Sequence, residues 1–225
     1  RGVFGRGSLL LPCKLGWLAE AGLGEVSVGR VRAIKGQGPP RLEAHVDRTL
    51  AEVVLSTAVE ELRGEVALDA AAYLIAEGRL LQPAAELLAD ALHLAAVARV
   101  LNLTKGRLDV DNVQEAARRR LVELGVCEAA DLALVDPEDL ALDVAAALKI
   151  DEAELQDLAR DFPRLWVHAG VEHRVLVERR PSPEVTLDVG KTKSAKAIPP
   201  PPGQVPHFRG LPVRWRKASR TVPLR

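Results

Sequence analysis

Aromatic residues and methionine are nearly missing from this sequence of 225 residues. Aromatics make up 3% of the chain and Met is absent, although 48% of the residues are hydrophobic. Any core must therefore be built from Ala, Leu and Val, and such small side chains favour closely packed helices. The 28% of charged residues is ordinary for a globular protein and excludes a wholly disordered or collagen-like chain.

Cysteine and long apolar runs are scarce as well. The two cysteines, Cys13 and Cys127, are too few for a disulfide framework or a zinc site. We interpret them as small buried hydrophobic residues or free thiols. The longest apolar stretch, residues 91–103, contains His93 and Arg99 and is shorter than the roughly 20 residues of a spanning helix. We therefore expect no transmembrane segment.

Acidic residues are missing from both ends of the sequence. None precedes Glu20, and a start that contains Arg and lacks acid is typical of organellar transit peptides and of the segment just after their cleavage site. We therefore expect an organelle, on the mitochondrial matrix side. Residues 189–225 contain nine Lys or Arg and no acid, so the rest of the chain has a net charge of −9. A basic arm on an acidic body predicts a negatively charged partner.

The hydrophobic periodicity predicts a mainly α chain. Alternating β-branched residues predict a strand over 25–35, with a bulge at Gly29. Apolar residues at helical spacing predict an amphipathic helix over 41–62. Further helices are predicted over 67–77 and 83–101, the second opened by a proline in its first turn. Together they form a helical body rich in Ala and Leu.

Helix-capping residues recur further along the chain. Asp109 or Asp111 is expected to cap a helix that ends at residue 125, and Asp136 to open one that runs to residue 148. Asp151 is expected to cap the last helix, which ends at residue 162. Short strand-like runs come next and predict a small β-hairpin, whereas the proline-rich end has no periodicity and predicts an extended, flexible arm.

The predicted domain organisation is based on these changes of pattern. It consists of an N-terminal extended or strand segment (1–38), a helical body (39–108), a second helical module (109–163), a short β-hairpin (164–189) and the extended basic arm (190–225).

The second helical module contains the run LVELGVCEAADLALVDPEDLALDVAAALKIDEAELQDLARDF. With its preceding helix, over about 113–162, it resembles the helix-hairpin-helix, SAM-like domains of DNA-repair and recombinase proteins. The resemblance implies compact helices and, in some relatives, contact with the nucleic-acid backbone through a G-x-G hairpin. Here Gly125 stands alone and Lys149 occupies the place of the second glycine. A degenerate module of this type that contacts proteins instead of nucleic acid fits the residues equally well.

Motifs for catalysis and metal binding are not found. Gly190-Lys191-Thr192 has Val185 where a phosphate-binding loop needs glycine, and no helix is expected after it. His168, Glu172 and His173 differ in spacing from the metalloprotease pattern and fall in a turn between strands. We therefore expect no enzyme activity, no cofactor and no metal.

Two functions remain. The first is a non-catalytic accessory subunit of a large assembly, which docks through its helical body and wraps other protein subunits with its arm. The alternative is a nucleic-acid-binding protein, of ribosome-associated or repair type, that uses the helical module and the arm. For a protein partner Trp215 is the expected anchor, and for nucleic acid the aromatic rings would stack on bases. In either case aromatic and basic residues of the arm are the predicted partner-binding residues: Phe208, Arg209, Arg214, Trp215, Arg216, Lys217 and Arg220.

Overall fold

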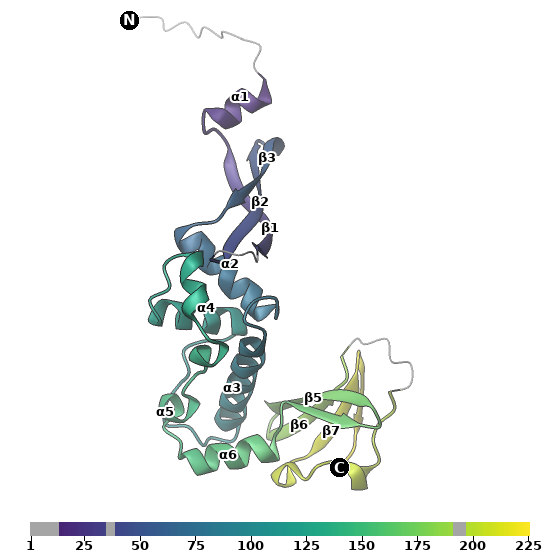
Figure 1. The fold of residues 1–225 in the computed structure, drawn as a ribbon. Coiled ribbons are helices and arrows are strands. Elements are labelled where there is room, and N and C mark those ends of the chain that lie inside the picture. The colour runs from purple at the N-terminus through teal and green to yellow at the C-terminus, as the bar shows by residue number, and fades with distance from the viewer. Residues whose placement is uncertain (1–13, 35–38, 191–196) are drawn as a thin grey trace, which may run out of the picture. The chain divides into compact units, whose positions relative to one another are not determined.

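The computed structural model describes residues 14–34, 39–190 and 197–225. Predictions about residues 1–13, including Cys13, and about Lys191, Lys193 and Lys196 lie outside the described residues. The fold is mixed α/β, with 39% helix, 28% strand and two sheets of three and five strands (Figure 1). The prediction of a mainly α chain is therefore wrong. The chain is divided into two compact units, unit 1 and unit 2, and each is described separately.

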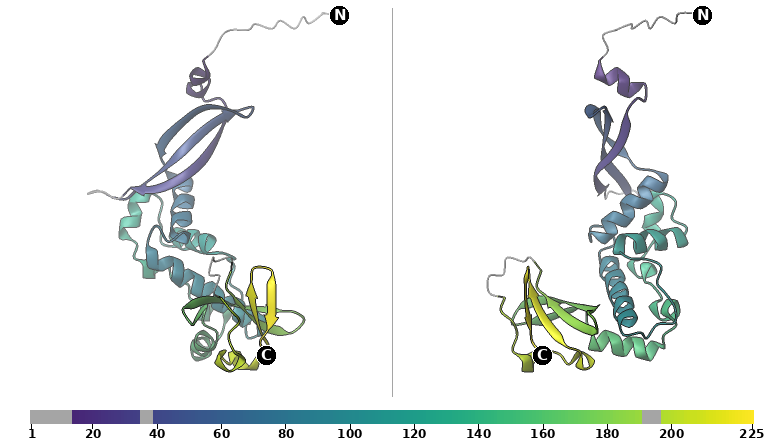
Figure 2. Two further views of the ribbon diagram at one scale, coloured as in Figure 1. Left: turned by 90° about the vertical axis from the view of Figure 1, so that its right-hand side faces the viewer. Right: turned by 180° about the vertical axis from the view of Figure 1, so that it is seen from behind.

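Unit 1 comprises residues up to 74 together with 125–135. Its centre is an antiparallel sheet in the order β1-β2-β3 (Figure 2). The elements are α1 (Leu15–Glu20), β1 (Glu25–Ile34), β2 (Arg41–Leu50), β3 (Val53–Glu61), most of α2 (Gly64–Ala76) and the 3₁₀ helix η1 (Ala129–Leu134).

The predicted strand over 25–35 is confirmed as β1, and so is its bulge. The pairing with β2 shifts register between Val28 and Val31, on either side of Gly29. Beyond the shift the face that carries Val31, Leu42 and Ala44 is buried. The segment η1 packs against β2 and contributes the buried Leu132 to this unit.

The predicted helix over 41–62 is wrong, because these residues form β2 and β3. Leu42, Ala44 and Val46 alternate with more exposed neighbours, which is the period of a strand with one buried face. Ala51 and Glu52 make the reversal between the strands in left-handed conformations, with φ of 47° and 66°. Tight hairpin turns of this kind normally contain Asn and Gly, so the sequence carried no sign of the turn.

Unit 2 comprises residues 75–124 and 136–225. Its helices are α3 (Gln82–Val100), α4 (Val113–Glu123), the 3₁₀ helix η2 (Pro137–Leu140), α5 (Val144–Leu148) and α6 (Glu152–Asp161).

Most of the predicted helix boundaries in unit 2 are confirmed, with two corrections. Asn112, and not Asp109 or Asp111, caps α4 by accepting a hydrogen bond from the backbone N–H of Glu115. The helix expected over 136–148 is split into η2 and α5, because the Asp143 side chain caps a new helix there. Asp151 caps α6 as expected.

The second part of unit 2 is a five-stranded sheet in the order β4-β5-β6-β7-β8. All neighbours are antiparallel except β6 and β7, which are parallel. The predicted hairpin within 164–189 is confirmed as β5 and β6. The strands are β4 (Leu165–His168), β5 (Val171–Arg179), β6 (Pro183–Asp188), β7 (Val213–Lys217) and β8 (Arg220–Pro223).

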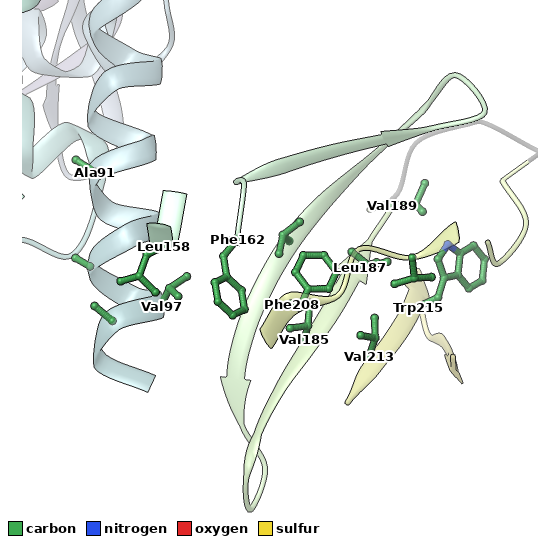
Figure 3. Close-up of a cluster of buried hydrophobic side chains, with 14 of the residues drawn as sticks. Ala91, Val97, Leu158, Phe162, Val185, Leu187, Val189, Phe208, Val213 and Trp215 are labelled. Atoms are coloured by element: carbon green, nitrogen blue, oxygen red, sulfur yellow. The ribbon is translucent and has the colours of Figure 1, made fainter. Parts of the chain in front are cut away.

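The prediction of a free extended arm is wrong for residues 197–225. These residues contain β7, β8 and the 3₁₀ helices η3 (Pro202–Gln204) and η4 (Phe208–Gly210). Ala197 and Val205 are buried in the same hydrophobic cluster as Leu158 of α6 and Val185 of β6. Figure 3 shows Phe208 beside Phe162, with their ring centroids 5.9 Å apart. The C-terminal segment therefore belongs to the core of unit 2.

Candidate binding surface

The predicted anchor Trp215 is a core residue. Its side chain is 1% exposed, and β7 places it in register with Leu187 of β6 and Val222 of β8 (Figure 3). Phe208 is equally buried. A side chain that already fills its own core cannot also fill a pocket in a partner. The structure thus corrects the role expected of Trp215 and Phe208.

Three of the arginines predicted to bind a partner, Arg209, Arg214 and Arg216, form ion pairs within the chain. Arg209 donates hydrogen bonds to Glu154 and Asp161 of α6, at 2.7 and 2.8 Å. The Nε atom of Arg214 lies 3.0 Å from the Glu184 carboxylate, which is nearly buried.

Arg216 pairs with Asp188 in the same way, with 3.0 Å between Nε and Oδ1. This hydrogen bond, assisted by a weaker one from the Gly190 N–H, holds the pKa of Asp188 below its usual value. Arg209 likewise lowers the pKa of Asp161. The positive charge of these arginines is therefore largely compensated by acids of the same chain.

Lys217 and Arg220, unlike the other predicted residues, lie on either side of the β7–β8 turn. They end β7 and begin β8, and they face each other across the β7–β8 turn. Arg220 is exposed. The structure places five of the predicted residues on β7 and β8 and the other two, Phe208 and Arg209, in η4. It does not arrange the basic residues as one continuous face.

The histidines of the β4–β5 hairpin pack against an aromatic ring. Trp166 stacks on His168 at 5.2 Å between ring centroids and lies 5.1 Å from His173. His173 is 1% exposed, and burial lowers the pKa of its imidazole. Within the described ranges, no group of three His, Cys, Asp or Glu side chains is arranged to hold a metal.

Cys127 is free and exposed, so of the two interpretations the free thiol is confirmed and the buried hydrophobic residue is wrong. Its backbone N–H and that of Glu128 donate to the Asp131 carboxylate, at 2.9 Å each. These bonds close the first turn of η1 and lower the pKa of Asp131.

Exposed valines on the sheet of unit 1 are the feature that the sequence analysis missed. Val26 and Val28 of β1 are 53% and 44% exposed. Their partners on β2 are Arg48 and Val46, which places them on the same face as the buried Ala44 and Leu42. This apolar face of the sheet is therefore buried at one end and exposed to solvent at the other. We call its exposed end, Val26 and Val28, the valine edge.

The valine edge also lies on an unpaired strand edge. In the described part of the chain, β1 pairs only with β2, so its other side presents backbone donors and acceptors. The bulge and the charged Arg30 and Arg32 protect the second half of β1 in the manner of natural edge strands. Residues 26–28 are regular and contain no charged side chain.

The signal for this surface was present in the sequence. Residues 53–59, VVLSTAV, are rich in β-branched residues and favour a strand, which the structure contains as β3 beside β2. The helical spacing of 46, 50, 53 and 54 competed with that signal, and without a turn motif the helix was preferred.

Comparison with protein-family models, with curated protein sequences and with solved structures found no match. None of the helices in the described ranges combines the length and the apolar character that crossing a membrane requires.

Proposed function

We propose that this chain is a non-catalytic, protein-binding part of a larger assembly and that the valine edge contacts its partner. The partner presents an extended segment that pairs with residues 25–28 of β1 and lays apolar side chains against Val26 and Val28. Backbone hydrogen bonds would provide affinity, and the alternating side chains would provide specificity.

One observation carries the proposal: an apolar sheet face that is half buried by its own unit and half exposed. Contiguous apolar surface beside an unprotected strand edge is a liability for a protein that stays alone, and it commonly marks an interaction site. The arginines paired with Asp and Glu of the same chain favour this function over nucleic-acid binding. A site for phosphates needs cations whose charge is available to the ligand.

The test is affinity purification of the tagged chain, with and without nuclease, followed by mass spectrometry. Two double variants are compared: Val26→Lys with Val28→Lys on the valine edge, and Val122→Lys with Leu124→Lys at the end of α4. The control side chains are equally exposed, at 51% and 41%, so both variants add the same charge to similar surface. Thermal melting of both variants should match the wild type.

We expect a nuclease-resistant set of proteins that is lost with the edge variant and kept with the control. A lysine buried in an interface without an opposite charge costs about 2–5 kcal/mol of binding free energy. That loss is enough for the partner protein to be removed by washing. If both variants keep the same proteins, the valine edge is not the contact. If every co-purifying protein disappears with nuclease, the chain belongs to the nucleic-acid-binding class instead.

A further inference from the structure

An open pocket of about 350 Å³ lies in unit 2, between α3, the end of α6 and the start of β4. Its size is at the lower end of the ~300–1,000 Å³ typical of small-molecule sites. Leu94, Pro163 and Leu165 form the main apolar part of the wall. Asp90, His93 and Arg164 supply the polar part. The valine edge is in the other unit, so this pocket is independent of the proposed function.

Two interactions fix the polar groups of the pocket. Arg164 donates from Nε to Oδ1 of Asp90, which ties the start of β4 to α3. His93 Nε2 lies 2.9 Å from the carbonyl oxygen of Phe162. Because a carbonyl can only accept, Nε2 carries the proton, and in the neutral ring Nδ1 is then an acceptor. Burial lowers the pKa of His93 and so favours this neutral form.

These interactions leave further polar atoms available beside the apolar wall. The hydrogen bonds among the described residues use Nε of Arg164 and Oδ1 of Asp90. The two Nη groups of the guanidinium and the second carboxylate oxygen are not used by them. Arginine donates from Nη in a fork that matches a carboxylate, and the carboxylate oxygen and Nδ1 of His93 accept from a donor such as an ammonium group.

We propose that this pocket binds a free α-amino acid with an aliphatic or aromatic side chain. The Nη groups of Arg164 hold the ligand carboxylate, and Asp90, with His93, accepts from the ligand ammonium group. The ligand side chain lies against Leu94, Pro163 and Leu165, whereas Phe162 is fully buried and does not touch it. A ligand with both charges matches the pair, whereas a simple anion would be repelled by Asp90 and a simple cation by Arg164.

The experiment is titration of the full chain by NMR or calorimetry with three probes of similar shape. Leucine carries both charges, N-acetyl-leucine lacks the ammonium group and leucinamide lacks the carboxylate. We expect each modified probe to bind roughly tenfold or more weakly, as for the loss of one charge-assisted hydrogen bond. Equal binding of leucine and either modified probe would overturn the proposal. So would the absence of leucine binding at about 10 mM.

Two variants assign the contacts. In Arg164→Gln, leucine should no longer bind more tightly than leucinamide, and in Asp90→Asn, leucine should no longer bind more tightly than N-acetyl-leucine. Arg160→Gln is the matched control: Arg160 pairs with Asp157 and Asp161 on α6 and does not line the pocket, so it should leave all three affinities unchanged. A variant that still prefers leucine to its modified probe contradicts the assignment. If a variant unfolds, the comparison of probes on the wild-type chain still decides.

Discussion

Trp215→Ala should destabilise unit 2 severely. The indole is 1% exposed on β7, which pairs with β6 on one side and β8 on the other. Truncation of a buried Phe or Trp to Ala typically costs about 3–5 kcal/mol, because the transfer free energy is lost and a cavity is left. A whole domain is stable by only about 5–15 kcal/mol. We therefore expect the thermal transition of unit 2 to fall steeply or to be absent.

Trp215→Phe separates packing from hydrogen bonding. The Trp215 Nε1 is buried without a hydrogen-bond partner among the described residues. A buried unpaired donor costs about 1–3 kcal/mol, and phenylalanine removes this donor while it keeps an aromatic ring in place. The smaller ring lowers the free energy of unfolding, and removal of the unpaired donor should offset part of this loss. The free energy of unfolding of Trp215→Phe should therefore be much closer to the wild-type value than that of Trp215→Ala.

The assay is urea unfolding followed by far-UV circular dichroism, which does not depend on the fluorophore being removed. Trp17→Ala is the control, because Trp17 is 54% exposed on α1 and its described aromatic contact is a cation–π contact with Lys14. That substitution should cost no more than about 1 kcal/mol. An unfolding curve of Trp215→Ala that matches the wild type would refute the placement of residues 213–217 in the sheet.

Two further predictions concern the turn of unit 1 and acid. Glu52→Gly should stabilise unit 1 by about 1 kcal/mol, because Glu52 is exposed and its φ of 66° is unfavourable for a residue with a Cβ atom. A lower urea midpoint for this variant would contradict the left-handed turn. Stability should fall as the pH drops through the ordinary histidine value of 6.5, because His93 and His173 have lowered pKa values and the unfolded chain binds protons more readily. It should fall again below the ordinary aspartate value of 3.8, as Asp161 and Asp188 are protonated. Urea midpoints measured across this pH range should show both losses of stability. The variant His93→Gln should reduce the loss near the histidine value. A midpoint independent of pH would contradict the burial of both imidazoles.

The elements that the sequence predicted correctly are stabilised by local interactions. The Asp151 cap and the first-turn residue Pro83 act on the first turn of their own helices, and the bulge at Gly29 interrupts an alternation that can be read along one strand. Such signals lie within a few residues of the structure they specify.

The errors concern elements that depend on distant residues. Strand β7 pairs in parallel with β6, and Leu187 and Trp215 meet only after a long connection. A short basic segment has no periodicity that indicates pairing with a distant strand, and its sequence therefore predicts an extended arm. The binding surface also depends on distant residues, because Val28 joins the apolar face only when β1 lies beside Val46 of β2. The pocket in unit 2 likewise joins Asp90 and Arg164, which are distant in the sequence and close only after folding.

The division of unit 1 into two stretches of chain has a consequence for synthesis. Val126, Ala129 and Leu132 are buried residues of this unit, and they lie beside Ala67, Leu68 and Ala71 of α2. A ribosome makes the sheet and α2 first and then about fifty residues of unit 2 before it reaches this closing segment. During that interval Ala67, Leu68 and Ala71 lack the cover that the closing segment supplies. Unit 1 thus begins to fold first, but it cannot be completed until about fifty residues of unit 2 have also been made.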